Sequence, residues 1–281
     1  MILVADSGST KTTWTEVESG DKIVTEGLNP YFSSDAQLLA VCKGVRKHFR
    51  PAAHRLQLFF YGAGCGNVSQ KRRMSVLLQQ GFESEDVVVE TDMLGACHAV
   101  SDGNPSLVGI LGTGSNACMF DGLAISYQAT STGYILGDKG SANHVGRVLL
   151  NDYLRHYMPE ALSHSFYDTY RMDATQFMDA VYHKPNPNRF LASLAPFAVS
   201  HLADDYCCQL IETTLREWWK DMLLPLCRQD GTLRLSVVGG YAKAIESVLR
   251  NVIEDLGVAV ESVVADPAEK LTKYHRDSKN S

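Results

Sequence analysis

The alternation of apolar and polar residues predicts three short strands at the start of the chain. Residues 2–5 (Ile-Leu-Val-Ala) form a short apolar run that is typical of a buried strand, and residues 11–17 and 22–27 continue as two more strands with turns between them. Short consecutive strands that are joined by turns favour an antiparallel meander. We therefore expect the chain to begin with three neighbouring antiparallel strands.

The segment after this meander has helical spacing. Apolar side chains recur on one helical face at Leu38, Leu39, Cys42, Val45 and Phe49. Ser34 is a favourable N-cap residue, so we expect a helix over residues 34–49. A strand, a helix and a strand are then predicted over residues 56–61, 68–80 and 87–90.

The same pattern restarts in the second third of the chain. Residues 107–111 read as a buried strand, residues 112–115 as a glycine turn, and residues 116–120 and 123–127 as the next strands. Residues 6–10 (Asp-Ser-Gly-Ser-Thr) align with residues 112–116 (Gly-Thr-Gly-Ser-Asn), each after a buried strand. This internal duplication predicts two halves of βββαβα type.

The rest of the chain is mainly helical with a return to strands. We expect helices over residues 141–228 with a loop at residues 184–188. A strand at residues 233–238, a glycine turn at 239–240, a helix at 242–256 and a strand at 258–263 then follow. The tail over residues 267–281 is expected to be helical and to fray at its end. The predicted domains are residues 1–103, onto which a tail of about 266–281 packs back, and residues 104–265, which carry a helical insertion.

Composition and charge limit the functional class. The chain has 281 residues with 45% hydrophobic and 21% charged residues, as in ordinary globular proteins, and its net charge of −6 argues against a nucleic-acid partner. No signal peptide precedes the first strand, and no apolar run reaches the length of a membrane span, so a cytoplasmic protein without a membrane partner is expected. Seven scattered cysteines without a C-x-x-C pair favour free thiols.

The first glycine-containing turn has the chemistry of a phosphate site. Small residues let the backbone approach a phosphate, and hydroxyl and N–H groups can donate to it; the candidates are Gly8, Ser9, Thr10, Lys11 and Thr12. Asp6, at the strand end, could hold Mg²⁺ through water. A tight hairpin with an acidic cap is the alternative. A P-loop is rejected because no glycine precedes Lys11 and a strand follows.

Two further turns complete the nucleotide hypothesis. The second phosphate-type turn consists of Gly112, Thr113, Gly114 and Ser115. Gly239 and Gly240 follow a strand and open a helix, where adenine and ribose could lie against the backbone; a close strand–helix packing turn is the alternative. Residues 62–67 resemble a dinucleotide fingerprint, but Asn67 replaces the last glycine and the strand before them is not the first, so NAD binding is disfavoured.

The order of these turns resembles the sugar kinase, heat-shock chaperone and actin superfamily. More narrowly, the chain resembles the N-acetylglucosamine kinase branch, which shares a sequence family with the ATPase activators of benzoyl-CoA reductase and 2-hydroxyacyl-CoA dehydratase. The matching stretches span nearly the whole chain: residues 6–12, 27–30, 62–64, 91–92, 112–116, 133–141 and 238–240.

The resemblance implies an α/β fold of two ribonuclease H-like, actin-like ATPase domains with a cleft that closes on ATP and substrate. It also implies that Asp92 is the catalytic base, that Asn29, Gly64, Asp138 and Ser141 belong to the sugar site, and that a homodimer can form. From the residues alone, the strand predicted at residues 87–90 ends at Thr91 and Asp92, and Asp92 could instead cap a helix. Asp138 could likewise cap a helix that starts near Gly140.

Two residues depart from the family pattern. Family kinases commonly have an acidic residue where this chain has Lys139, and the animal enzymes have a tryptophan where it has Thr132. N-acetylglucosamine is therefore the first expectation for the substrate, and glucosamine or another hexose is the alternative.

The expected function is ATP-dependent phosphorylation of the 6-hydroxyl of the amino sugar, with Mg·ATP held between the two phosphate turns. An ATPase activator is disfavoured because Cys65 and Cys118 lie near glycine turns without a Cys-Ala-Ala-Gly segment. A non-catalytic regulator is disfavoured by the retained Asp92.

Overall fold

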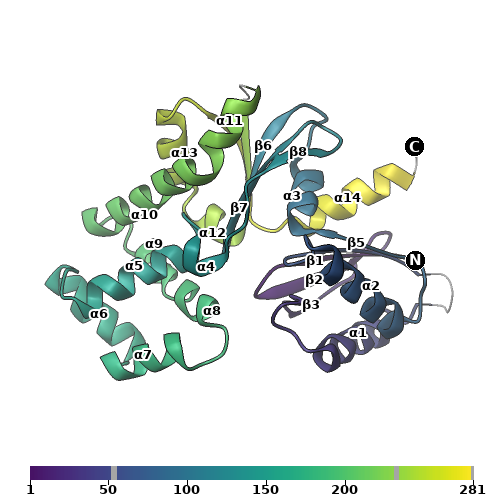
Figure 1. The fold of residues 1–281 in the computed structure, drawn as a ribbon, viewed down its shortest axis with the longest axis horizontal. Coiled ribbons are helices and arrows are strands. Elements are labelled where there is room, and N and C mark those ends of the chain that lie inside the picture. Colours follow the sequence, from purple (N-terminus) through teal and green to yellow (C-terminus); the bar gives the residue numbers. More distant parts are fainter. Residues whose placement is uncertain (52–55, 231–233, 280–281) are drawn as a thin grey trace. The chain divides into compact units, whose positions relative to one another are not determined.

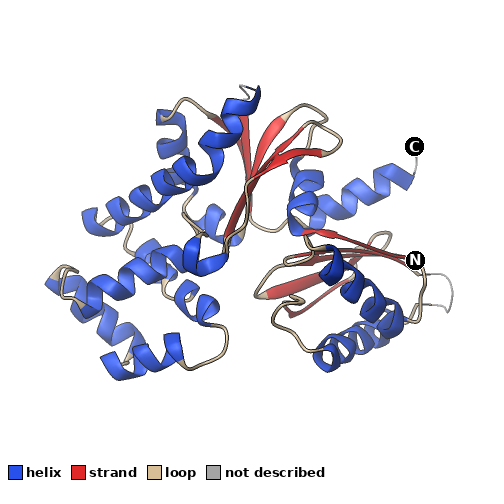
Figure 2. Cartoon of the chain, viewed as in Figure 1, coloured by secondary structure: helices blue, strands red, loops and turns tan. Residues whose placement is uncertain are grey.

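The computed structural model describes residues 1–51, 56–230 and 234–279, and the chain forms two compact units (Figure 1). The first unit consists of Met1–Gly103 together with Asp266–Ser281, and the second unit consists of Asn104–Ala265. Each unit is built around one mixed sheet of five strands (Figure 2).

The sheet of the first unit has the strand order β3-β2-β1-β4-β5. Its strands are β1 (Ile2–Ser7), β2 (Lys11–Glu16), β3 (Lys22–Glu26), β4 (Gln57–Gly62) and β5 (Val87–Thr91). Strands β1, β2 and β3 are antiparallel neighbours, which confirms the predicted meander. Strands β1, β4 and β5 are parallel, so their carboxyl ends lie at one edge, where Ser7 pairs with Gly62 and Gly62 with Thr91.

Helices cover both faces of this sheet. On one face lie α1 (Asp35–Phe49) and α2 (Val68–Phe82), and on the other lie α3 (Asp92–Val100) and the C-terminal α14 (Ala268–Lys279) (Figure 1). Successive side chains of β1 point to opposite faces of the sheet and so pack against both helix layers. Leu3 and Ala5 join the core beneath α1 and α2, whereas Val4 packs with Leu271 of α14.

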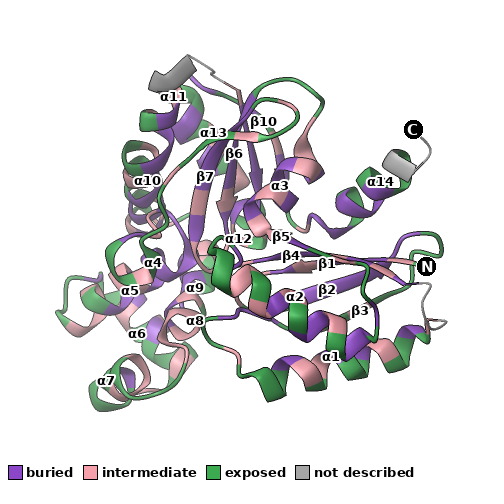
Figure 3. Cartoon of the chain, turned by 45° about the vertical axis from the view of Figure 1, so that its right-hand side comes forward, coloured by how far each residue is buried: buried purple, intermediate pink, exposed green. Residues whose placement is uncertain are grey.

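Helix α1 forms as the sequence predicts. Ser34 is its N-cap and accepts a hydrogen bond from the Gln37 N–H, while the Gln37 side chain accepts from the Ser34 N–H in a capping box. Leu38 and Val45 are among the residues of its predicted apolar face that are buried, and the opposite face is exposed (Figure 3). The helix ends at Phe49.

The sheet of the second unit repeats the topology of the first, with the order β10-β9-β6-β7-β8. Its strands are β6 (Ser106–Leu111), β7 (Ser115–Phe120), β8 (Ile125–Gln128), β9 (Arg234–Val238) and β10 (Ala259–Val264). Strands β6, β7 and β8 are antiparallel, and β6, β9 and β10 are parallel. The two sheets thus confirm the internal duplication.

Helices fill the rest of the second unit. They are α4 (Gly133–Leu136), α5 (Ala142–Leu154), α6 (Glu160–Tyr170), α7 (Ala174–Tyr182), α8 (Pro187–Ala192), α9 (Ala195–Ser200), α10 (Asp205–Trp218), the π-helix η1 (Trp219–Leu223), α11 (Leu224–Asp230), α12 (Gly240–Ala244) and α13 (Glu246–Asp255). One hydrophobic core joins these helices to the sheet, with Phe166, Leu215 and Trp218 fully buried in it.

Two expected boundaries are wrong. The loop expected at residues 184–188 is shorter because Pro187 occupies the first position of α8, where its fixed φ and missing N–H suit a helix start. The helix expected at residues 242–256 is divided into α12 and α13 at Ile245, whose φ of −110° and ψ of 18° are not helical. The Ile245 side chain is fully buried in the core, which fixes this change of direction.

Within the described ranges, no helix is both long and apolar enough to cross a bilayer. All seven cysteines are free thiols, as expected, and five of them are buried.

Candidate functional site

The turn between β1 and β2 is tight and rests on the segment after β3. The Gly8 N–H donates to the Lys11 carbonyl over 3.0 Å, and the Gly27 N–H donates to the Thr10 carbonyl over 3.0 Å. A Cβ atom at Gly27 would lie 2.4 Å from the carbonyl oxygen of Gly8, so only glycine allows this approach. Thr10 at the tip is exposed. The backbone of the predicted phosphate turn is therefore held in place by the segment after β3.

Two hydroxyl groups support this turn from inside the first unit. The side-chain oxygens of Ser7 and Thr12 lie 2.7 Å apart, and the Leu28 N–H donates to Ser7 Oγ over 3.1 Å. Thr12 is fully buried, and its hydroxyl also donates to the Glu26 carbonyl over 3.1 Å. Thr12 is a predicted phosphate contact, but its hydroxyl is engaged within the protein.

Asp6 lies in a concentration of negative charge at the end of β1. Burial first, and then the charges of the neighbouring Asp266 and Asp92, raise its pKa to about 7 against the opposing effect of Lys11. In the described part of the first unit, no group donates a hydrogen bond to its carboxylate. A carboxylate that is partly dehydrated beside like charges is stabilised by a hard cation. The site therefore fits the expected Mg²⁺ better than a neutral ligand.

Nothing in the described part of the chain forms a cluster of three or more metal-ligating side chains. Lys11, a predicted phosphate contact, has its Nζ atom 2.6 Å from Asp266 Oδ2 at the start of the C-terminal segment. Although burial opposes it, the hydrogen bond from Lys11 holds the pKa of Asp266 below its usual value.

Asp92 is the first residue of α3, directly after β5. The alternative that it caps the helix is wrong, because Thr91 is the N-cap and its Oγ1 accepts from the Leu94 N–H over 3.1 Å. Asp92 Oδ1 accepts from the Met93 N–H over 2.9 Å. Burial raises the pKa of Asp92 to about 6. The hydrogen bond from the Met93 N–H and a further backbone hydrogen bond oppose this rise. Such a carboxyl group can exchange a proton near neutral pH.

The structure brings two predicted sugar-site residues into contact. Gly64, in the turn after β4, has a φ of +84°, and a Cβ there would lie 2.5 Å from Asn29 Oδ1. Asn29 is buried, and its Oδ1 accepts from the Tyr31 N–H over 2.9 Å. The same turn lies beside Thr91, the residue before Asp92, because a Cβ at Gly66 would be 4.0 Å from the Thr91 methyl group. One edge of the first sheet therefore holds all these groups.

The second glycine turn is held by the start of α5. The Gly112 N–H donates to the Gly114 carbonyl over 2.9 Å, and the Ala142 N–H donates to the Gly112 carbonyl over 3.0 Å. Asn143 donates twice to the Thr113 carbonyl, from its backbone N–H over 3.1 Å and from Nδ2 over 2.6 Å. Sequence reasoning missed Asn143, because no local signal marks a side chain that reaches back about thirty residues.

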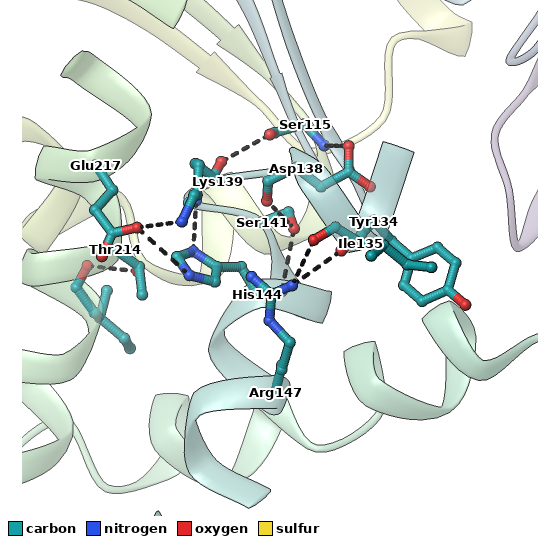
Figure 4. Close-up of polar contacts among 12 residues, drawn as sticks. Ser115, Tyr134, Ile135, Asp138, Lys139, Ser141, His144, Arg147, Thr214 and Glu217 are labelled. Atoms are coloured by element: carbon teal, nitrogen blue, oxygen red, sulfur yellow. Dashed lines mark hydrogen bonds and ion pairs between the residues drawn. The ribbon is translucent and has the colours of Figure 1, made fainter. Parts of the chain in front are cut away.

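Asp138 belongs to this same assembly. Its Oδ1 accepts from the Ser115 N–H over 3.3 Å (Figure 4). Its Oδ2 accepts from Asn143 Nδ2 over 3.1 Å. A Cβ at Gly114 would lie 2.8 Å from Asp138 Oδ2, so this glycine allows the carboxylate to approach. Burial raises the pKa of Asp138 against these two hydrogen bonds. The residue has a left-handed backbone with a φ of +52°.

The alternative that Asp138 caps the following helix is wrong. Ser141 caps α5 by accepting from the His144 N–H over 3.3 Å, and its hydroxyl donates to the Asp138 carbonyl over 2.7 Å. Ser141 is fully buried. Its predicted role in sugar binding is thus accompanied by a structural role that occupies the hydroxyl.

Lys139 and Asp138 extend in opposite directions (Figure 4). Lys139 Nζ lies 2.7 Å from Glu217 Oε2 on α10, and His144 Nε2 lies 3.7 Å from the same oxygen. Burial lowers the pKa of His144 to about 4 even though Glu217 opposes this. The departure at Lys139 is therefore compensated by an acidic residue from another helix, which the sequence did not reveal.

The third glycine turn lies next to the second. Gly239 has a φ of +138°, and a Cβ there would lie 2.1 Å from the Leu111 carbonyl oxygen, at the end of β6. Close packing therefore accounts for Gly239. A Cβ at Gly240 would meet no atom within 4 Å, so its backbone is open to a ligand.

Solved structures match this chain, whereas no protein-family model and no curated protein sequence does. The structure is similar to that of a Porphyromonas gingivalis protein provisionally assigned as an N-acetylglucosamine kinase, with a TM-score of 0.92 and 33% identity over 99% of this chain and 100% of that one.

Two more distant structures share the fold. A protein from Chromobacterium violaceum with the same provisional assignment has a TM-score of 0.73 and 18% identity, covering 97% of this chain and 98% of its own. MreB 5 of Spiroplasma citri, solved with AMPPNP, has a TM-score of 0.55 and 12% identity, covering 99% of this chain and 96% of its own.

Proposed function

Because the chain belongs to the sugar kinase, heat-shock chaperone and actin superfamily, we propose that it is an ATP-dependent kinase that phosphorylates the 6-hydroxyl of an amino sugar, N-acetylglucosamine before other hexoses. The provisional assignment of the Porphyromonas gingivalis protein supports this choice, since the two chains are 33% identical over their full lengths.

The observation that carries the proposal is the environment of Asp92. Phosphoryl transfer to a hydroxyl needs a positioned base that accepts the proton as the new bond forms. Asp92 is buried enough for its pKa to rise to about 6, so it is ionised at pH 7 yet remains able to take a proton. It lies at the same sheet edge as Asn29 and Gly64.

Both phosphate turns take part in nucleotide binding in this proposal. Gly8, Ser9, Thr10 and Lys11 supply donors from one turn, and residues 112–115 supply them from the other. Asp6 would hold Mg²⁺ through water, and the ion would neutralise charge on the phosphates. Gly240, whose backbone is open to a ligand, leaves room for the adenosine, and Gly239 lets the turn pack closely against the end of β6.

The sugar is recognised by side chains that are already fixed. Asn29 and Asp138 each have one or two hydrogen bonds within the protein that hold the side chain in place. Fixed polar groups discriminate strongly between substrates, because a wrong sugar leaves them without partners. We assign hydroxyl and acetamido recognition to these two residues.

A sugar panel tests the function. Purified protein is incubated with Mg·ATP and N-acetylglucosamine, glucosamine, glucose or no sugar, and the formation of ADP and of sugar phosphate is measured. Sugar-dependent ADP formation that Asp92→Asn abolishes is the expected result. ATP binding without turnover on any sugar would instead indicate a non-catalytic regulator.

The activator alternative has a physical difficulty. A cluster shared between subunits needs thiolates at the surface, whereas Cys65 and Cys118 are only 1% and 0% exposed. Burial raises the pKa of the Cys65 thiol to about 12, which opposes metal ligation.

A further inference from the structure

Two consecutive aromatic side chains, Tyr31 and Phe32, are exposed just after Asn29 and Pro30. Tyr31 is 58% exposed and Phe32 is 59% exposed, although each could bury a large apolar area. They lie in the turn between β3 and α1, at the sheet edge that carries the candidate site.

This turn is fixed rather than loose. The Asn29 carbonyl accepts hydrogen bonds from the Phe32 N–H over 3.0 Å and from the Ser33 N–H over 2.9 Å. Arg73 of α2 donates to the carbonyls of Pro30 and Ser33. The exposure of the two rings is therefore built into a braced backbone, as in loops that present binding residues.

The side chain of Tyr31 contacts a residue of the candidate sugar site. The nearest atoms to a Cβ at Gly64 belong to Asn29 and to the Tyr31 ring, whose Cδ2 would be 3.1 Å away. The Tyr31 ring therefore lies against the Gly64 backbone. Its N–H binds Asn29 Oδ1, which leaves the Asn29 Nδ2 group without a partner among the described residues and available to a ligand.

The Tyr31 ring and the Gly64 backbone lie close to the end of β5, where the proposed base Asp92 follows Thr91. Gly66, two residues after Gly64, would place a Cβ 4.0 Å from Thr91, the residue before Asp92. The charge of Asp92 also adds to the burial that raises the pKa of the Cys65 thiol. A ligand on the Tyr31 ring and the Gly64 backbone is thus next to the turn that adjoins the proposed base.

We infer that Tyr31 is a specificity-determining residue that binds the substrate by packing its ring against the apolar C–H face of a pyranose, while the Asn29 amide donates to a sugar oxygen. This inference rests on the proposed function and narrows its substrate class to cyclic sugars with equatorial hydroxyl groups, whose axial C–H bonds form such a face. Ligand sites commonly combine aromatic packing with a few placed polar groups in this way.

Kinetics of matched variants test the role of the ring. Tyr31→Ala should lower kcat/KM for the sugar by about tenfold and leave the KM for Mg·ATP within about twofold, because the lost contact involves the sugar alone. Tyr31→Phe should keep nearly full activity. Phe32→Ala is the control, since it removes an equally exposed aromatic side chain that is not paired with Gly64. Equal losses in both alanine variants, or a normal Tyr31→Ala enzyme, would overturn the inference.

A binding experiment separates this inference from the proposed function. Trp14 and Trp218 are fully buried and Trp219 is partly buried, so Tyr31→Trp adds an exposed indole, and its change in emission beyond that of the parent protein reports contact with added N-acetylglucosamine in the absence of ATP. We expect a saturable emission change in Tyr31→Trp and none in Phe32→Trp. No change in Tyr31→Trp, with sugar phosphorylation intact, would refute the Tyr31 contact alone. A saturable change without phosphorylation of any sugar would refute the kinase proposal alone.

Discussion

The backbone N–H of Ser115 donates a hydrogen bond to Oδ1 of Asp138 over 3.3 Å, so the second glycine turn is bonded to the carboxylate of the Gly-Asp motif. Asn143 extends this bond into a network, because its Nδ2 reaches both Asp138 and the Thr113 carbonyl. A change to the candidate sugar residue therefore also reaches the candidate phosphate turn.

Asp138→Ala should raise the sugar KM or lower kcat, with kcat/KM reduced by about tenfold or more, since a fixed hydrogen-bond acceptor is lost. Affinity for Mg·ATP should not fall, because the Ser115 N–H is released and a negative charge near the turn is removed. Initial rates with each substrate varied, together with calorimetry, measure both effects. Weaker ATP binding with unchanged sugar kinetics would contradict the assignment.

Asn143→Ala tests the support of the second turn. The substitution leaves the Thr113 carbonyl with one donor fewer in a buried place, so we expect about 1–3 kcal/mol of lost unfolding free energy and a raised KM for Mg·ATP. Urea denaturation and steady-state kinetics measure the two. Asn151→Ala is a suitable control on the exposed side of α5. A variant as stable as the parent with normal ATP kinetics would show that the network is dispensable.

Asp92→Asn separates proton transfer from structure. Thr91 caps α3, and an asparagine oxygen can still accept from the Met93 N–H, so the melting temperature and ATP affinity should match the parent. Because asparagine cannot accept the hydroxyl proton, kcat should fall on the order of a hundredfold or more. Near-normal sugar phosphorylation by this variant would remove Asp92 from the mechanism.

The pH profile of the reaction should reflect the same residue. Burial raises the pKa of Asp92 to about 6, and only the ionised form can act as a base. We expect kcat to be constant above pH 7 and to fall about tenfold per pH unit well below pH 6. A profile that stays level down to pH 4.5, at constant saturation with both substrates, would be incompatible with this base.

Asp6→Ala should weaken the binding of Mg·ATP and make turnover less responsive to magnesium, because the water-mediated ion loses its anchor. Its thermal stability should not fall, since a carboxylate that burial and two like charges disfavour has been removed. Calorimetry with and without Mg²⁺ and a thermal melt test both points. Unchanged affinity and turnover would exclude the assigned role.

Acid should destabilise the fold through two buried histidines. Burial lowers the pKa of His275 and of His144 to about 4, below the unfolded value of about 6.5. Between these values the unfolded chain binds more protons, so unfolding free energy decreases as pH falls from 6.5 to 4, by on the order of 2 kcal/mol per histidine. Urea midpoints at pH 7 and 5 measure this. His275→Gln should reduce the difference, and an unchanged slope would refute its contribution.

Features that depend on neighbouring residues along the chain can be predicted from the sequence. The helix that follows Ser34, the three-stranded meanders and the repeated strand–glycine turn are visible because caps and hydrophobic periods act over a few positions. The two corresponding sheets follow from that repetition. Asp92 was also placed correctly at a strand end, since β5 stops at Thr91.

The hydrogen-bond partners of the polar groups, in contrast, depend on how the folded chain packs. A helix start offers several N–H groups, and nothing local tells that Thr91 rather than Asp92 and Ser141 rather than Asp138 take the capping role. The contact of Gly64 with Asn29, and the pairing of Lys139 with Glu217, join residues far apart along the chain. Such contacts depend on how whole elements pack, which no local period encodes.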